Sequence, residues 1–400
     1  MEILFVSGWY PYPPDNGARA RVYNLLRELS KKHSVRLVSF IEHSSQAGES
    51  QLRPLLGFCE SVDTIPRREY TKNSWSVSRS LLSSKPPYIA HRYNSELSRV
   101  AKIRVDESNP DIVIISEVQN LPLLDEVSFE RPVVLEQFEV GTIWDGVDAA
   151  TGYKRITRKI TRNTWARYVS NHFDKLDGVT VPSSKEEMIL RGLLSRANRG
   201  DLPVTLIPNG INERDSSQSS VEKQGVTLVY QGSLRFTANL DAMEFFVSSI
   251  LPLIQQYKSD VILQITGSCE GANLSKISGR KGVELTGYLD NVEDVVSAAS
   301  VCVIPLRLGS GTRIKALEAM ALGTPVVSTS KGVEGIDVED GVHVLLADDP
   351  DSFARGVLRL LSDVDLRMEI AKNARRLVFQ EYTWTKIGKR LSDFCEAICL

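Results

Sequence analysis

The chain has 400 residues, of which 42% are hydrophobic and 24% are charged, proportions typical of a soluble globular protein. Its length predicts two domains, and its formal net charge of −2 provides no overall attraction to nucleic acid. The five cysteines are scattered without a CxxC pair, and no run of about 18 apolar residues occurs. We therefore expect a cytoplasmic protein without disulfides, a metal site or a membrane-spanning helix.

The N-terminal segment opens with the pattern of a doubly wound sheet. Residues 2–7 and 34–41 are apolar runs of buried-strand character, and residues 19–32 between them repeat apolar side chains at helical spacing. A loop dense in proline and glycine, residues 8–18, joins the first strand to that helix. Ligands of such sheets bind beyond the carboxyl ends of the strands, so the strand ends are the places to look for a site.

The next clear strands are followed by polar residues. Residues 111–116 form an apolar run, and Glu117 and Gln119 come directly after it. Their place at a strand end makes both residues candidates for ligand binding. They are equally typical of a surface loop, and this alternative stays open. Residues 132–135 predict a further strand, which is followed by the sequence EQFEVGTIW.

Residues 152–172 contain six basic residues and no acidic one. Four of the six, Arg155, Arg158, Lys159 and Arg162, follow the i, i+3, i+4, i+7 spacing of one helix face. Such a helix is suited to peripheral contact with an anionic membrane. A solvated helix between domains is the alternative.

In the second half of the chain, apolar runs at residues 227–231, 261–266 and 283–287 predict further strands. Residues 301–328 then predict a strand, a glycine turn, a helix over residues 312–322 and another strand. Gly323 is the expected stop of that helix.

The glycine turn has the chemistry of an anion site. Glycines lack a Cβ, so backbone amides can approach a ligand closely. The helix expected after the turn adds the positive end of its dipole, and two basic side chains add full charges. We interpret the turn as a nucleotide-diphosphate pocket formed by Gly311, Thr312, Arg313 and Lys315.

Glu318 lies one turn further along the same helix face as Lys315, where a carboxylate can bond a ribose hydroxyl. The alternative is an ordinary strand–helix–strand unit with turn glycines and a solvated Lys–Glu pair. GSGTRI lacks the third glycine of GxGxxG, and GxxxxGK[ST] does not occur, so a dinucleotide fingerprint and a P-loop are excluded.

The stretch GTRIKALEAMALGTPVVST, with GVEGIDVEDGVHVLLADDP after it, resembles the donor-binding segment of family-4 glycosyltransferases of the GT-B fold. The similarity is greatest to the bacterial branch associated with polysaccharide and exopolysaccharide assembly. It implies an α/β fold of two facing Rossmann-like domains with a cleft between them. We place the acceptor-side domain at residues 1–203 and the donor-binding domain at 204–384, with a terminal helix, 385–400, that packs back on the first domain.

The resemblance also implies the reaction. A sugar would pass from a nucleoside-diphosphate donor to a saccharide or lipid-linked acceptor, with retention at the sugar carbon and without a cofactor or metal. By this reading, Glu117 and Gln119 become acceptor-binding candidates.

Several donor contacts are implied by matching positions. Gly17 and Arg21 match the first loop of the family, although a helix-entry turn and a solvated helix face explain them as well. Gly232 matches the glycine beside the diphosphate, while Tyr288 and Leu289 match the loop whose backbone contacts the base.

The chain departs from the family pattern at catalytic positions. Phe138 stands where relatives have a histidine, so we rank Glu139 first, ahead of Glu136, as a replacement. The first glutamate of the usual pair is Ser310.

The arginine and lysine that clamp the diphosphate in relatives fall on Ser233 and Asn239. We expect Arg313 to take over this charge as a catalytic residue, with Arg235 nearby as a further donor contact. Two other functions remain open, a catalytically idle nucleotide-sugar-binding subunit and a nucleotide-sugar epimerase.

Overall fold

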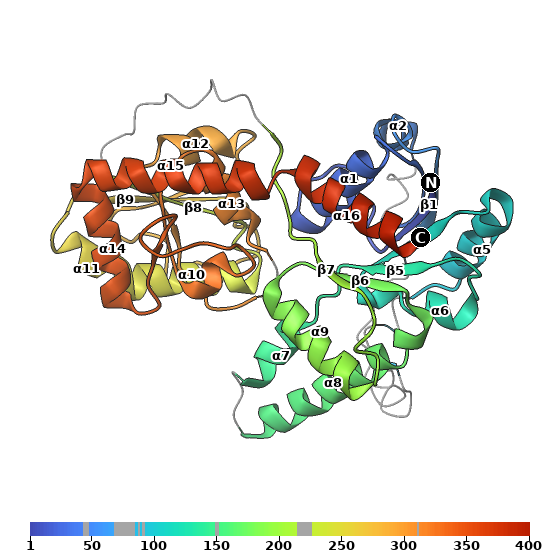
Figure 1. Cartoon of the computed structure of the whole chain (residues 1–400). Coiled ribbons are helices and arrows are strands. Elements are labelled where there is room, and N and C mark those ends of the chain that lie inside the picture. The colour runs from blue at the N-terminus through green and yellow to red at the C-terminus, as the bar shows by residue number, and fades with distance from the viewer. Residues whose placement is uncertain are drawn as a thin grey trace. The chain divides into compact units, whose positions relative to one another are not determined.

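The computed structural model describes residues 1–42, 48–67, 85, 86, 89, 93–148, 152–213, 226–309 and 312–400 (Figure 1). The chain forms two compact units: Met1–Pro208 together with Trp384–Leu400, and Asn209–Thr383. Each unit is built around one parallel sheet, with seven strands in the first and six in the second. This arrangement confirms the predicted α/β class.

The first sheet changes winding direction between β1 and β4, since β1 pairs with β2 on one side and with β4 on the other. In spatial order its strands are β3 (Ser61–Pro66), β2 (Ser34–Ile41), β1 (Glu2–Ser7), β4 (Ile112–Ser116), β5 (Val133–Glu136), β6 (Gly178–Val181) and β7 (Val204–Leu206). The carboxyl ends of β1 and β4 therefore form the switch point at which ligands of such sheets bind.

Alternate residues of these strands enter two separate cores. On β1, Leu4 and Val6 belong to one core, and Ile3 and Phe5 to the other. Figure 1 shows α1 and α16 on one face of the sheet and α8 and α9 on the other. The helices of this unit are α1 (Gly17–Leu29), α2 (Glu49–Leu56), α5 (Glu96–Ser108), α6 (Leu123–Glu126), α7 (Gly141–Asp148), α8 (Gly152–Ser170), α9 (Ser184–Arg196) and α16 (Trp384–Ile398).

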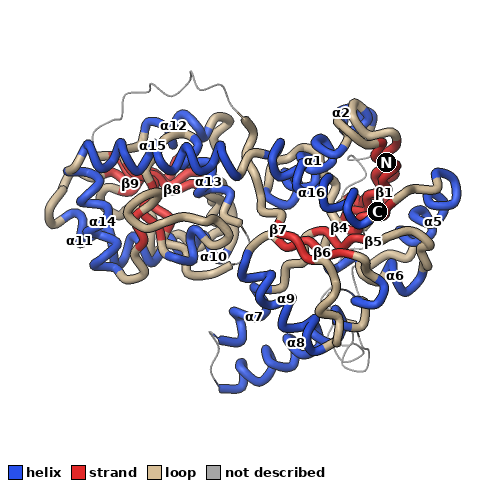
Figure 2. Tube along the Cα trace, viewed as in Figure 1, coloured by secondary structure: helices blue, strands red, loops and turns tan. Residues whose placement is uncertain are grey.

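The second sheet has the same plan, with its switch point between β8 and β11. Its strands in spatial order are β10 (Val283–Gly287), β9 (Ile262–Thr266), β8 (Thr227–Gln231), β11 (Val301–Ile304), β12 (Val326–Ser328) and β13 (Leu345–Leu346). Figure 2 shows helices on both sides of these strands. They are α10 (Thr237–Phe245), continued by a π-helical turn and α11 (Leu251–Gln255), then α12 (Val292–Ala298), α13 (Ile314–Ala321), α14 (Pro350–Ser362) and α15 (Val364–Glu381).

The structure corrects two predicted boundaries. We expected the second domain to begin at residue 204, but Val204–Leu206 pairs with β6 and completes the first sheet. The helix expected over residues 312–322 begins only at Ile314, because Arg313 has the non-helical backbone of an N-cap residue. Its predicted stop is confirmed, since Gly323 has a φ of 71°.

None of the helices in the described part of the chain is both long and apolar enough to span a bilayer.

Candidate functional site

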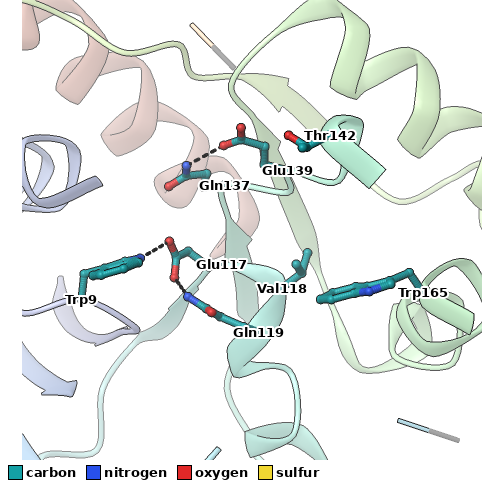
Figure 3. A pocket seen from close by; sticks show the side chains of 8 residues that line it. All are labelled: Trp9, Glu117, Val118, Gln119, Gln137, Glu139, Thr142 and Trp165. Atoms are coloured by element: carbon teal, nitrogen blue, oxygen red, sulfur yellow. Dashed lines mark hydrogen bonds between the residues drawn. The ribbon is translucent and has the colours of Figure 1, made fainter. Parts of the chain in front are cut away.

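A cavity of about 580 Å³ lies in the first unit, beyond the carboxyl ends of its central strands. Figure 3 shows its lining from the loop after β1, the segments after β4 and β5, and helices α7 and α8. The lining residues are Trp9, Glu117, Val118, Gln119, Gln137, Glu139, Thr142 and Trp165. The predicted acceptor residues and the predicted catalytic residue Glu139 are therefore brought together.

Glu117 is the central polar group of this cavity. The indole Nε1–H of Trp9 donates to Glu117 Oε1 at 2.6 Å, and the amide of Gln119 donates to the other oxygen. Gly8 leaves the space for this arrangement, because a Cβ at that position would lie 2.5 Å from Glu117 Oε2. The side chain is thus fixed by partners from two strand ends.

Burial raises the pKa of Glu117 to about 7, although the hydrogen bond from Gln119 and the charge of Arg67 favour the ionised form. Its backbone is also unusual, with a φ of 69°, and Gln137 at the next strand end has a φ of 61°. Strained backbone and a carboxyl that titrates near neutrality are both common at functional sites.

Glu139 lies half-buried on the same cavity and accepts a hydrogen bond of 2.9 Å from the amide of Gln137. The loop that carries it is held by Glu186, whose carboxylate accepts the backbone N–H groups of Val140 and Gly141 at 2.9 and 2.8 Å. Glu186 therefore caps the start of α7, and its own burial raises its pKa to about 7.

Phe138, at the position where the family has a histidine, is fully buried in the core. Its ring supplies no proton-transfer group, and the backbone N–H donates to Thr180 O at 2.8 Å. Glu139 is therefore the acidic side chain of this loop that faces the cavity.

Arg21 and Glu136 form a buried ion pair instead of a ligand contact. Both side chains are almost fully buried, and Arg21 Nη2 lies 2.5 Å from Glu136 Oε1. Arg21 also donates to the carbonyl of Ile207 at 2.7 Å, and Ser116 donates to Glu136 Oε2 at 3.0 Å. These contacts occupy the guanidinium within the first unit, and the donor contact expected for Arg21 stays a prediction. Glu136 is held by the same network.

In the second unit, two glycines make room at the strand ends. Gly232 follows β8 with a φ of 147°, and a Cβ there would lie 2.8 Å from Lys315 Nζ. Gly267 follows β9 with a φ of 106°, and its Cβ would lie 2.8 Å from the backbone of Gly232. The backbone segments after β8 and β9 therefore pack closely beside the switch point of the second sheet, where ligands of such sheets bind.

Lys315 extends from α13 to this point. Its ammonium donates to the hydroxyl of Tyr230 and to Asn239 Oδ1, both at 2.8 Å, and lies 4.3 Å from the centre of the Tyr230 ring. Burial, together with the nearby charge of Arg313, lowers the pKa of Lys315 to about 7. The amine is thus in place for an anion that would restore its charge.

The remaining residues of the predicted donor site surround α13. Gln231 donates to Glu318 Oε2 at 3.0 Å and to the carbonyl of Lys315 at 2.8 Å, which ties the end of β8 to the helix. Arg313 lies at the N-cap of α13, where its Nε donates to the carbonyl of Lys331 at 3.1 Å. Thr312 is buried, and its hydroxyl accepts the backbone N–H of Asn209 at 3.2 Å.

Other predicted donor residues lie on the surface. Arg235 and Tyr288 are exposed, Leu289 is half-buried, and Gly17 is the exposed first residue of α1. The guanidinium of Arg235 lies 3.8 Å from a carboxylate oxygen of Glu270. Their ligand contacts stay predictions. Gly311 lies outside the described residues.

Sequence reasoning missed several residues of the cavity, namely Trp9, Gln137, Thr142 and Trp165. Trp9 and Gln137 each lie just past a strand, so the rule that identified Glu117 could have identified them. Trp165 had no such signal, because it reaches the cavity from the C-terminal third of α8 and not from a strand end.

Comparisons with known proteins agree with this architecture. Residues 225–363 match the model of a family described as glycosyl transferases group 1. An uncharacterized glycosyltransferase of Methanocaldococcus jannaschii is 29% identical over 237 residues, which are 54% of this chain and 59% of that protein. A lipopolysaccharide 1,2-N-acetylglucosaminetransferase of Salmonella typhimurium is 29% identical over 68% of this chain and 77% of its own length.

Among solved structures, Anabaena HepE in complex with UDP is similar with a TM-score of 0.68 and 14% identity, over 99% of this chain and 100% of that one. These matches show that residues 225–363 are similar to glycosyltransferases and that the chain has the GT-B fold that the resemblance implied.

Proposed function

We propose that the chain transfers a sugar from a nucleoside-diphosphate donor to a saccharide or lipid-linked acceptor in polysaccharide or lipopolysaccharide assembly. The observation that carries this proposal is that Gly232, Lys315 and Glu318 lie close together at the end of β8. All three belong to residues 225–363, which match the glycosyl transferases group 1 family. The bound nucleotide of HepE and the acceptor chemistry named for the Salmonella relative support the donor and acceptor classes.

The proposed roles follow from the contacts. Lys315 and Arg313 stabilise negative charge on the departing diphosphate, and the tight turn at Gly232 lets the phosphates approach the backbone. Glu318 bonds a ribose hydroxyl. The side chains therefore act mainly by positioning and by electrostatic stabilisation, with no further cofactor or metal.

On the acceptor side, Glu117 and Gln119 bind hydroxyls and Glu139 orients the attacking one. Transfer with retention, on the face from which the diphosphate departs, is part of the proposal, as is membership in family 4. The reaction is of the hexosyl-transfer type and takes place in the cytoplasm, with α8 in contact with an anionic membrane surface.

A thermal-shift panel of nucleoside diphosphates tests the donor site. A ligand that binds only the folded chain raises the melting temperature by mass action. We expect one nucleotide to raise the melting temperature of the wild type, in the presence of EDTA as well. Its apparent affinity for Glu318→Ala, derived from the same shifts, should be at least about threefold weaker, because one hydrogen bond is lost. Glu284→Ala, an exposed change on β10, is the matched control. If no nucleotide at millimolar concentration shifts the melting temperature, the donor site is refuted.

A catalytically idle nucleotide-sugar-binding subunit is the second candidate, and the buried Phe138 favours it. This candidate predicts the same nucleotide response but no sugar transfer or hydrolysis of the donor. Release of free nucleotide that depends on an added acceptor would exclude it, and would also argue against an epimerase.

A further inference from the structure

The cavity of the first unit has a lining whose chemistry defines a class of ligand. Figure 3 shows the rings of Trp9 and Trp165 on opposite sides, with Glu117, Val118 and Gln119 between them. Its volume of about 580 Å³ is within the range of small-molecule sites. Two aromatic surfaces combined with carboxylates and amides suit a molecule that has apolar C–H faces and many hydroxyl groups.

The charged groups of the described lining are all acidic. Glu117 and Glu139 contribute carboxyl groups, whereas none of the eight described lining residues is a lysine or an arginine. Arg67, whose charge favours the ionised form of Glu117, is not part of this lining. Its guanidinium carbon lies 4.9 Å from the centre of the Trp9 ring, and it donates a hydrogen bond to the carbonyl of Gly8. An anionic ligand would meet two acidic groups here without a cation of the lining to pair with.

The polar groups are also oriented before a ligand arrives. Trp9 and Gln119 hold both oxygens of Glu117, while Gln137 holds Glu139. Each carboxylate oxygen retains a further lone pair that can accept a hydroxyl proton. A sugar ring can therefore donate hydroxyls to both carboxylates without a rearrangement of the lining.

We propose that this cavity binds an uncharged, hydroxyl-rich sugar residue of the acceptor and rejects the corresponding uronic acid. The assignment rests on the proposed function, whose acceptor it narrows to a saccharide with a neutral terminal residue. Trp9 is the principal stacking surface, and Glu117 and Glu139 provide the selection against negative charge.

Binding of paired probes to the full chain tests this assignment. Methyl glycosides of glucose, galactose and mannose and the three matching methyl uronosides are titrated at pH 8 by saturation-transfer difference NMR. We expect at least one neutral member to bind and its uronoside to bind at least about tenfold more weakly, because like charges repel strongly in a partly enclosed site. The assignment is overturned if no neutral glycoside binds, or if the uronosides bind as well as their neutral partners.

Matched variants identify the responsible groups. Glu139→Gln keeps the shape of the side chain and removes its charge, so the discrimination against the uronoside should fall at least about threefold. Trp9→Leu should weaken binding of the neutral glycoside, because it removes both the stacking surface and the indole N–H that holds Glu117. Glu187→Gln, on α9 outside the cavity lining, is the control for a lost charge. It should change neither the affinity for the neutral glycoside nor the ratio between the neutral glycoside and its uronoside. If the ratio of neutral-glycoside affinity to uronoside affinity is the same in the wild type and Glu139→Gln, the electrostatic selection is refuted.

The nucleotide shift described above is measured on the same variants. If the nucleotide still raises the melting temperature while no sugar binds, the cavity assignment is refuted and the proposed transferase function stands. If the nucleotide has no effect while neutral sugars bind better than uronosides, the donor site is refuted and the cavity assignment stands.

Discussion

Lys315 is a buried amine whose protonation can respond to a bound anion. The side chain is enclosed by the Tyr230 ring and Asn239, and its pKa is lowered to about 7, so above that pH the free protein holds it largely uncharged. A diphosphate beside the amine would favour the charged form and raise the pKa again. Ligand binding and protonation are then linked.

Nucleotide binding should therefore take up protons at pH 8 and much less at pH 6, where the amine is already charged. Calorimetric titration with a nucleoside diphosphate in buffers of different ionisation enthalpy measures this uptake. Lys315→Met should abolish most of it, whereas Lys276→Met, which removes an exposed lysine of the same unit, should not. The same uptake in wild type and Lys315→Met would show that another group is protonated.

For single residues, the sequence predicted which side chains belong to the site better than it predicted which residues they contact. Glu117 was recognised from its place after a strand and Glu139 from the family resemblance, and both line the same cavity. The pairing of Arg21 with Glu136 was not predicted, because Glu136 is 115 residues away and a helical repeat contains no sign of such a pair. Lys315 was predicted as a donor residue beside Arg313, but the sequence did not show that its amine lies against Gly232 and Asn239.

Among the elements, α8 combines exposure with charge. Its first ten residues, 152–161, are all exposed, although the helix ends in the buried Trp165, Tyr168 and Val169. Tyr153, Ile156 and Ile160 are 79%, 58% and 52% exposed and follow the i, i+3, i+7 spacing of one face. The basic residues lie on the rest of the helix surface, as in helices that bind anionic interfaces.

We expect the full chain to sediment with vesicles that contain anionic phosphatidylglycerol and to remain in solution with phosphatidylcholine alone. Each basic residue near such a surface contributes about 1 kcal/mol, so Arg155→Gln/Arg158→Gln/Lys159→Gln should weaken the association more than about tenfold. Arg191→Gln/Arg196→Gln on α9 is the control with a comparable loss of charge. Equal sedimentation of the α8 variant and the wild type would refute the membrane contact.

Elements with a clear apolar pattern, either an apolar run or an amphipathic repeat, were predicted closely. The strand expected over residues 227–231 and the helix expected over 385–400 correspond to β8 and to α16. The edge strand β7 was assigned to the wrong domain, because an edge strand of three half-buried residues has a weak apolar pattern. The strands of the first sheet therefore had to be assigned from their pairing, which the sequence does not show.

For the whole molecule, the closest packing described for α16 is against α1. Trp384, Ile387 and Leu391 are buried in the same core as residues of α1. At Gly388 the two helices approach so closely that a Cβ would lie 2.2 Å from Cβ of Glu28. Residues near opposite ends of the sequence thus belong to one unit.

Gly388→Ala should destabilise the protein by about 1–3 kcal/mol, because the added methyl group requires the two helices to separate. The melting temperature and the urea midpoint measure this change. Gly192→Ala is the matched control, since it lies within α9 and its Cβ would meet no atom within 4 Å. Without a clash, alanine should stabilise that helix by about 0.5–1 kcal/mol. A neutral effect of Gly388→Ala would show that the contact relaxes at little cost.

The return of α16 to the first unit also sets the order in which the units can be completed during synthesis. Residues 209–383 leave the ribosome as one continuous segment, so the second unit has all of its residues before α16 is made. The first unit has its sheet much earlier, but it exposes the apolar surface that Trp384, Ile387 and Leu391 later cover. A nascent chain therefore carries one finished unit and one unfinished unit until its last helix emerges, and the unfinished unit is where a chaperone would bind.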